Sequence, residues 1–158
     1  MKNKLPKNLI KFLLAGAEVL FVGILCYLRV LNGGWNLLFY GILLILWALI
    51  HLGLMTAFIV SLKLSMIDIV LYLAVHFFYL WAWLFQYDGG DSPSSSGWTI
   101  QTIHHIAALD PFLQQWGDTL FQVMSIATFV CYLIIFILLV VRLVQFLRSR
   151  DKNSQSAG

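Results

Sequence analysis

The sequence has 158 residues, of which 61% are hydrophobic and only 11% are charged, and its mean hydropathy is +0.87. Soluble domains carry about 25% charged residues, so this composition indicates a membrane protein. A spanning helix needs about 20 apolar residues, and the length therefore excludes a large catalytic domain outside the membrane. The net charge of +3 comes from the ends of the chain, and we expect no nucleic-acid partner.

Four charge-poor intervals predict four transmembrane helices, at about 8–30, 35–61, 65–87 and 118–148. The first interval is interrupted by Glu18, and the third has Asp68 near its start. We therefore expect an all-α membrane protein, with the whole chain forming one polytopic domain in the lipid bilayer.

A long loop at about 88–117 separates the last two predicted helices. Its first part, DGGDSPSSSG, is polar and rich in turn residues. Apolar residues then recur at helical spacing from 98 to 109, which predicts a short amphipathic helix on the outer interface. Asp110 followed by Pro111 is typical of a helix start. The tail at 150–158 is short and polar.

The basic residues predict the orientation of the chain. Nine of the ten lie in the N-terminal flank, the loop between the second and third helices, or the C-terminal end. Only Arg29 falls on the other side, where the segment from 88 to 118 has four Asp and no Lys or Arg. Short basic flanks stay in the cytoplasm. We therefore expect both termini to be cytoplasmic in a multi-pass protein of the cell (inner) membrane.

Two predicted helices carry polar and aromatic stripes. On the third, spacings of 4, 4, 3 and 4 place five side chains within roughly 80° of arc, namely Asp68, Tyr72, His76, Tyr79 and Trp83. On the second, the stripe is formed by Tyr40, Trp47, His51 and Met55. His51 and His76 are equally far along the chain from the linker near Lys63, so both imidazoles should lie at one depth, about 18 Å from the turn.

Three interpretations of the two histidines remain open from the sequence. His51 and His76 at equal depth are an arrangement suited to bis-histidine ligation of haem b. Together with Tyr72 and Tyr79 they also suit a quinone or a lipid headgroup. Alternatively, the histidines form hydrogen bonds that fix how the two helices pack, and no cofactor is needed.

Glu18 and Asp68 are carboxylates within predicted spans, and such residues mark ion paths or contacts with partners. A structural interpretation also exists for each. Glu18 lies seven residues after Lys11 on one helical face, and Asp68 lies near the boundary beside Lys63.

Neither a catalytic nor a metal-binding motif is recognisable. His104 and His105 are adjacent, point about 100° apart on a helix, and are expected to be an exposed pair. We therefore expect no enzymatic activity, no catalytic residues and no metal site.

The sequence leads to one principal functional hypothesis and two alternatives. The principal one is a non-enzymatic integral subunit of a larger membrane complex, packed against other integral membrane subunits and shielding or docking at the outer face. The first alternative is a redox membrane anchor that binds haem b or quinone through His51 and His76. The second is a small proton- or ion-conducting or immunity-type membrane protein that uses Glu18 and the intramembrane histidines as a proton or ion path.

The predicted orientation can be tested by thiol labelling. In a chain with Cys26 and Cys131 replaced by alanine, a cysteine at Ser95 should react with an impermeant thiol reagent in intact cells. A cysteine at Ser154 should react only after the cells are opened, because short basic flanks stay in the cytoplasm. Labelling of Ser154→Cys in intact cells would contradict the orientation.

Overall fold

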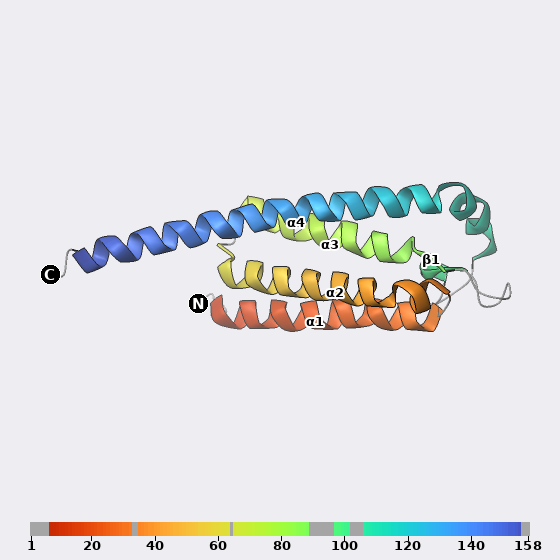
Figure 1. The fold of residues 1–158 in the computed structure, drawn as a ribbon, viewed down its shortest axis with the longest axis horizontal. Coiled ribbons are helices and arrows are strands. Elements are labelled where there is room, and N and C mark those ends of the chain that lie inside the picture. The colour runs from red at the N-terminus through yellow and green to blue at the C-terminus, as the bar shows by residue number, and fades with distance from the viewer. Residues whose placement is uncertain (1–6, 33–34, 64, 89–96, 102–105, 156–158) are drawn as a thin grey trace, which may run out of the picture.

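The computed structural model describes residues 7–32, 35–63, 65–88, 97–101 and 106–155. Its four long helices are α1 (Lys7–Asn32), α2 (Trp35–Ser61), α3 (Met66–Leu84) and α4 (Asp110–Gln155). They run side by side along one axis, with the start of α1 and the end of α4 at the same end (Figure 1). The most extensive contacts join α1 with α2 and α3 with α4. The described chain is thus an all-α bundle.

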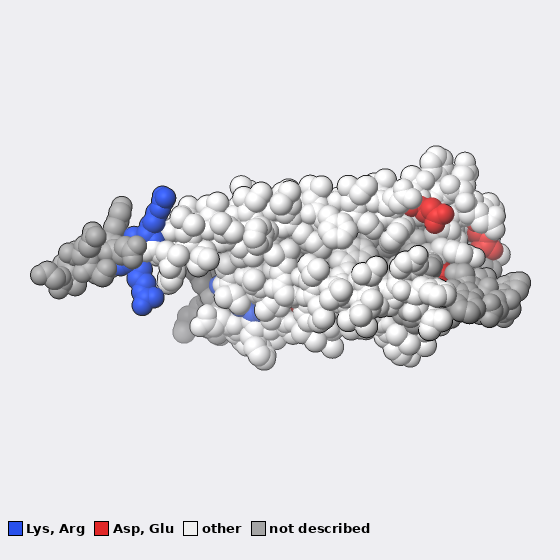
Figure 2. All heavy atoms as spheres, in the orientation of Figure 1, with Lys and Arg blue, Asp and Glu red and all other residues white. Residues whose placement is uncertain are grey.

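All four helices are long and apolar enough to cross a membrane. The apolar stretches of α1 and α2 contain 25 and 24 residues, and the 19 residues of α3 rise about 28 Å. α1 and α2 are therefore longer than the roughly 30 Å of hydrocarbon, and α3 is shorter than it by less than one helical turn. On the face shown in Figure 2, Lys and Arg gather toward one end, Asp and Glu gather at the other, and the surface between is nearly uncharged. These features are those of a multi-pass helical membrane protein.

The core is a cluster of buried side chains along the axis of the bundle, with Val22, Met55, Phe58, Val75, Tyr79 and Ile135 among its members. The outer surface is also apolar, since Phe12, Leu38 and Ile42 are at least 70% exposed. An apolar exterior around a bundle is expected when lipid is the solvent.

A short hairpin closes the base of the long loop. β1 (Tyr87–Asp88) pairs antiparallel with β2 (Gly97–Trp98), and the 3-10 turns η2 (Thr99–Gln101) and η3 (Ala107–Leu109) follow. The backbone N–H of Thr99 donates to the carbonyl of Gln86, which extends this pairing. Because the ladder takes up the chain from residue 87, α3 ends at Leu84 and not at the predicted 87.

The amphipathic helix predicted for 98–109 falls partly on residues 102–105, which lie outside the described residues. The described residues on either side form 3-10 turns, because strand pairing fixes the segment at Trp98. α4 begins at Asp110, where the Asp-Pro pair favours a helix start, and not at 118. It continues through Gly117 and ends at Gln155, beyond the predicted 148, since one glycine weakens a helix by only about 1 kcal/mol.

Gly117 tests the packing of α4 against the loop. A Cβ added at Gly117 would lie 2.2 Å from Cη2 of Trp98, whose ring packs with Phe85 and Leu113. We expect Gly117→Ala to lower the free energy of unfolding by about 1–3 kcal/mol, because the ring has to move. The measurement is denaturant unfolding in mixed micelles.

Gly53→Ala is the matched control, because no heavy atom outside the adjacent residues and backbone of its own helix lies within 4 Å of the added methyl group. It should be neutral or stabilising by up to about 1 kcal/mol. Equal effects of the two substitutions would contradict the close contact at Gly117.

Candidate functional site

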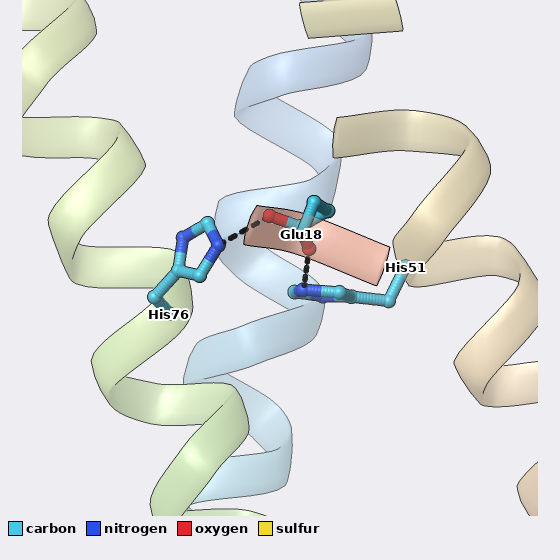
Figure 3. A group of neighbouring side chains, drawn as sticks. All are labelled: Glu18, His51 and His76. Atoms are coloured by element: carbon cyan, nitrogen blue, oxygen red, sulfur yellow. Dashed lines mark hydrogen bonds and ion pairs between the residues drawn. The ribbon is translucent and has the colours of Figure 1, made fainter. Parts of the chain in front are cut away.

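Three helices bring one polar side chain each to the middle of the bundle. Glu18 comes from α1, His51 from α2 and His76 from α3, and the carboxyl group of Glu18 lies between the two imidazoles (Figure 3). We call these three residues the central triad. Each lies within two residues of the middle of its apolar span. Glu18 and His51 are fully buried, and the side chain of His76 is 17% exposed.

The two oxygens of Glu18 contact different histidines. Oε2 lies 2.6 Å from Nε2 of His76 and forms a hydrogen bond with it. Oε1 lies 2.8 Å from Nε2 of His51, but the two atoms are not aligned as a hydrogen bond, and both are otherwise without a hydrogen-bond partner. The triad is therefore held firmly on one side and is incompletely satisfied on the other.

The other ring nitrogen of each histidine contacts an outer residue. Nδ1 of His76 donates to the backbone carbonyl of Tyr72 at 2.7 Å, because a carbonyl can only accept. Nδ1 of His51 lies 2.7 Å from the hydroxyl of Tyr132 on α4, which can donate or accept. These contacts orient both rings so that the two Nε2 atoms face Glu18.

Aromatic rings enclose the triad. Tyr79 stacks on His51 with ring centroids 3.7 Å apart and planes 12° apart. Phe21 packs against both imidazoles, at 6.3 Å from His51 and 5.2 Å from His76. Together these rings keep the polar atoms away from lipid and restrict the imidazoles to few orientations.

The chemistry available to the triad follows from its donor atoms. Since Nδ1 of His76 carries a hydrogen, one further proton sits in the short bond between its Nε2 and Glu18. One carboxylate and two imidazoles offer oxygen and nitrogen lone pairs to a cation. An unpaired charge at this depth would cost several kcal/mol, so the triad has to hold a proton or another cation.

Two ion pairs lie away from the triad, toward the ends of the bundle. Arg29 of α1 contacts the carboxylate of Asp88 in β1 at 2.7 Å, and both are buried. At the other end, Arg142 of α4 pairs with Asp68 of α3 and also donates to the backbone carbonyl of Ser61. These pairs fasten the loop to α1 and join α2, α3 and α4.

The structure brings together five of the six residues that the sequence singled out. His51, His76, Tyr72, Tyr79 and Glu18 meet at one place, whereas Asp68 lies near the start of α3. Asp68 is close to Lys63 as expected, but it accepts from the backbone N–H of Lys63 and pairs with a different residue, Arg142.

The structural interpretation of Glu18 as a partner of Lys11 is wrong. The ammonium group of Lys11 donates instead to the backbone carbonyl of Val60 on α2. The side chain of Glu18 points toward α2 and α3, where its partners are two imidazoles and not the lysine.

Sequence reasoning also missed Tyr132 and the Arg29–Asp88 pair. A usable signal existed for Glu18, because its depth in the first span matches that of the histidines. No comparable signal pointed to Tyr132. His104 and His105 lie outside the described residues.

A groove of about 430 Å³ lies between α2 and α4, beside the triad. Its walls are mostly apolar and include Leu43, Trp47 and Phe129. No residue of the central triad lines it.

Comparison with protein-family models, with curated proteins and with solved structures finds no match to this chain, so its function has to be inferred from the geometry of the triad.

The buried pair at Arg29 offers a test of the fold around the site. Arg29→Met removes the guanidinium that contacts the buried carboxylate of Asp88, and we expect a loss of about 3–5 kcal/mol in the free energy of unfolding. The double variant Arg29→Met/Asp88→Leu removes both charges and should recover most of that loss. If the single and double variants unfold alike, the pair does not couple the loop to α1.

Proposed function

We propose that this protein is a small membrane transporter for a cation, and that the central triad of Glu18, His51 and His76 is its binding site. The observation that carries the proposal is a buried carboxylate bridging two imidazoles from different helices at the middle of the spans.

The depth of the triad supports a site used in transport. Ionisable side chains inside the membrane are costly and mark ion pathways. Secondary transporters bind their coupling ions near the midplane of the bilayer. A bundle held only for stability would gain as much or more from apolar residues of similar volume at these three positions.

Incomplete hydrogen bonding at Glu18 also supports a binding role. The carboxylate of Asp68 is well satisfied, because it accepts from Arg142 and from the backbone N–H of Lys63. In contrast, one oxygen of Glu18 and the facing nitrogen of His51 contact each other at 2.8 Å without an aligned hydrogen bond. A bound ion at this contact would give both atoms an aligned partner.

The direction of the polar contacts favours a carrier over an open channel. The contacts run from the carbonyl of Tyr72 through His76, Glu18 and His51 to Tyr132, and so cross the bundle from α3 to α4 at one depth. A row of groups at one depth holds an ion but does not lead it from one face to the other. Release to the two sides then requires the helices around the triad to move.

The cofactors considered from the sequence receive less support. Glu18 already bridges His51 and His76, so its carboxylate occupies the place between the two imidazoles that a haem iron would need. A quinone in the groove between α2 and α4 would touch Trp47 and not the histidines. In a bilayer, lipid chains fill an apolar groove of this kind.

A role as an integral subunit of a larger complex is the second candidate, and the length of α4 favours it. Beyond Arg142, which pairs with Asp68, α4 extends past the other helices (Figure 1). Leu143, Phe146 and Leu147 on this extension are 49–62% exposed, and partner helices would cover them. A chain that purifies alone in mild detergent would contradict this candidate.

The charge distribution supports a location in the cell (inner) membrane with both termini on the cytoplasmic side. The start of α1 and the end of α4 lie at one end, where Lys and Arg gather on the face of Figure 2. Basic flanks of spanning helices remain on the cytoplasmic side.

Flux in liposomes tests the transport proposal. Vesicles that contain the full chain should dissipate an imposed gradient of protons, Na⁺ or Zn²⁺, each measured separately with a suitable dye. Glu18→Gln should reduce that flux at least tenfold, because the amide keeps the shape of the side chain but loses its charge.

Asp118→Asn is the control for this experiment, since it makes the same chemical change at an exposed position of α4. Its flux should equal that of the unaltered protein. Flux that is absent for all three ions, or that is unchanged in Glu18→Gln, would reject the proposal.

A further inference from the structure

We infer that the cation held by the central triad is a divalent first-row transition-metal ion, with Zn²⁺ as the representative probe. This inference rests on the proposed function in so far as it names the transported ion, but binding itself can be tested without transport. One donor atom from each of Glu18, His51 and His76 lies within 4.8 Å of the others, so a single ion can reach all three.

The donor set selects a class of metal. Imidazole nitrogen suits Zn²⁺, Fe²⁺ and Cu²⁺, whereas Mg²⁺ and Ca²⁺ prefer sites made of oxygen. Two histidines with one carboxylate occur both in zinc sites and in sites of non-haem iron. The triad supplies this set from three separate helices. It leaves further coordination positions on the ion open for water or another small ligand.

The outer contacts are those of metal-ligating histidines. Such histidines usually donate their second ring N–H to a carbonyl or another oxygen, which fixes the ring and makes the free nitrogen a better ligand. His76 makes this contact with the carbonyl of Tyr72. His51 can make it with the hydroxyl of Tyr132, which is able to accept as well as to donate. Once the proton shared by His76 and Glu18 has left, both Nε2 atoms present lone pairs toward Glu18.

The two open atoms of the triad point to an additional ligand. Oε1 of Glu18 and Nε2 of His51 are buried, 2.8 Å apart and without an aligned hydrogen bond. Ligand atoms around tetrahedral zinc lie about 3.3 Å from one another, given metal–ligand bonds of about 2.0–2.1 Å. Widening the present contacts of 2.6 and 2.8 Å by about 0.5–0.7 Å would bring them to this separation.

The charge of the triad suits a divalent ion better than a trivalent one. One carboxylate offsets one of the two charges of a divalent ion, two neutral imidazoles add none, and an anionic ligand in an open coordination position would offset the second. The two described ion pairs, Arg29–Asp88 and Arg142–Asp68, are each neutral and involve no residue of the triad, so they add no net charge to it.

Binding of Zn²⁺ to the purified full chain tests the inference directly. After treatment with a chelator in mild detergent, calorimetric titration should show one Zn²⁺ per chain, and Zn²⁺ should raise the melting temperature. An excess of Mg²⁺ should not compete. Glu18→Gln should weaken Zn²⁺ binding roughly a hundredfold or more and abolish the thermal shift.

Two further variants keep the test decisive if Glu18→Gln fails to fold. Tyr132→Phe keeps the ring but removes the contact with His51, and should weaken binding by roughly 10- to 100-fold. His104→Gln/His105→Gln removes the only other histidines of the chain and should leave Zn²⁺ affinity unchanged.

Each contrary outcome has a distinct meaning. Zn²⁺ binding that disappears in His104→Gln/His105→Gln but survives in Glu18→Gln would overturn the inference. Proton or Na⁺ flux that depends on Glu18, without Zn²⁺ binding, would keep transport and reject the metal. Zn²⁺ binding at the triad without any flux would keep the metal site and reject transport.

Discussion

Hydrocarbon offers no water to a buried charge, and this constraint determines how the four helices of this protein are arranged. Lipid is as apolar as leucine, so apolar contacts alone give little reason for one helix to choose another. Arg29 pairs with Asp88, Arg142 pairs with Asp68, and Glu18 lies against His51 and His76. Each contact joins different parts of the chain, so satisfying the charges also assembles the bundle.

The carboxylates of Asp68 and Glu18 differ in how completely they are satisfied. Asp68 near the start of α3 has a guanidinium and a backbone N–H, and little is left for a ligand to gain there. Glu18 at the middle has one aligned hydrogen bond and one unaligned contact. Stability explains the first arrangement, whereas the second leaves lone pairs near the middle of the spans, where the proposed cation would bind.

The four spans and the shared depth of His51 and His76 were predictable from the sequence. The length of a charge-free segment indicates where the chain crosses lipid. Because the linker between the second and third helices is short, residues equally far from it on the two helices lie at the same depth. The same arithmetic places Glu18 at that depth, but it does not tell which way the side chain points. Because the position of α1 around α2 and α3 depends on contacts between distant residues, Glu18 could not be assigned to the histidines in advance.

Tyr132 and Arg29 were missed for a related reason. Tyr132 sits in a long run without a charged residue, between Asp118 and Arg142, and nothing in that run suggested a role for it. Arg29 looked like a flanking charge, and only the hairpin of β1 and β2 brings Asp88 to it. Asp88 is placed by the pairing of β1 with β2 across a segment whose composition indicates only turns. Hydrophobic periodicity does not predict such strand pairing.

The same hairpin has a consequence for how this protein can vary. β1 and β2 hold the two ends of the loop side by side, with Tyr87 opposite Trp98 and Asp88 opposite Gly97. Arg29 anchors the first strand and Gly117 receives the ring from the second. Doubling the length of a loop closed in this way costs only about 0.6 kcal/mol. Insertions between the strands, such as an epitope or a recognition sequence, can therefore be accepted without moving Glu18 or its two histidines.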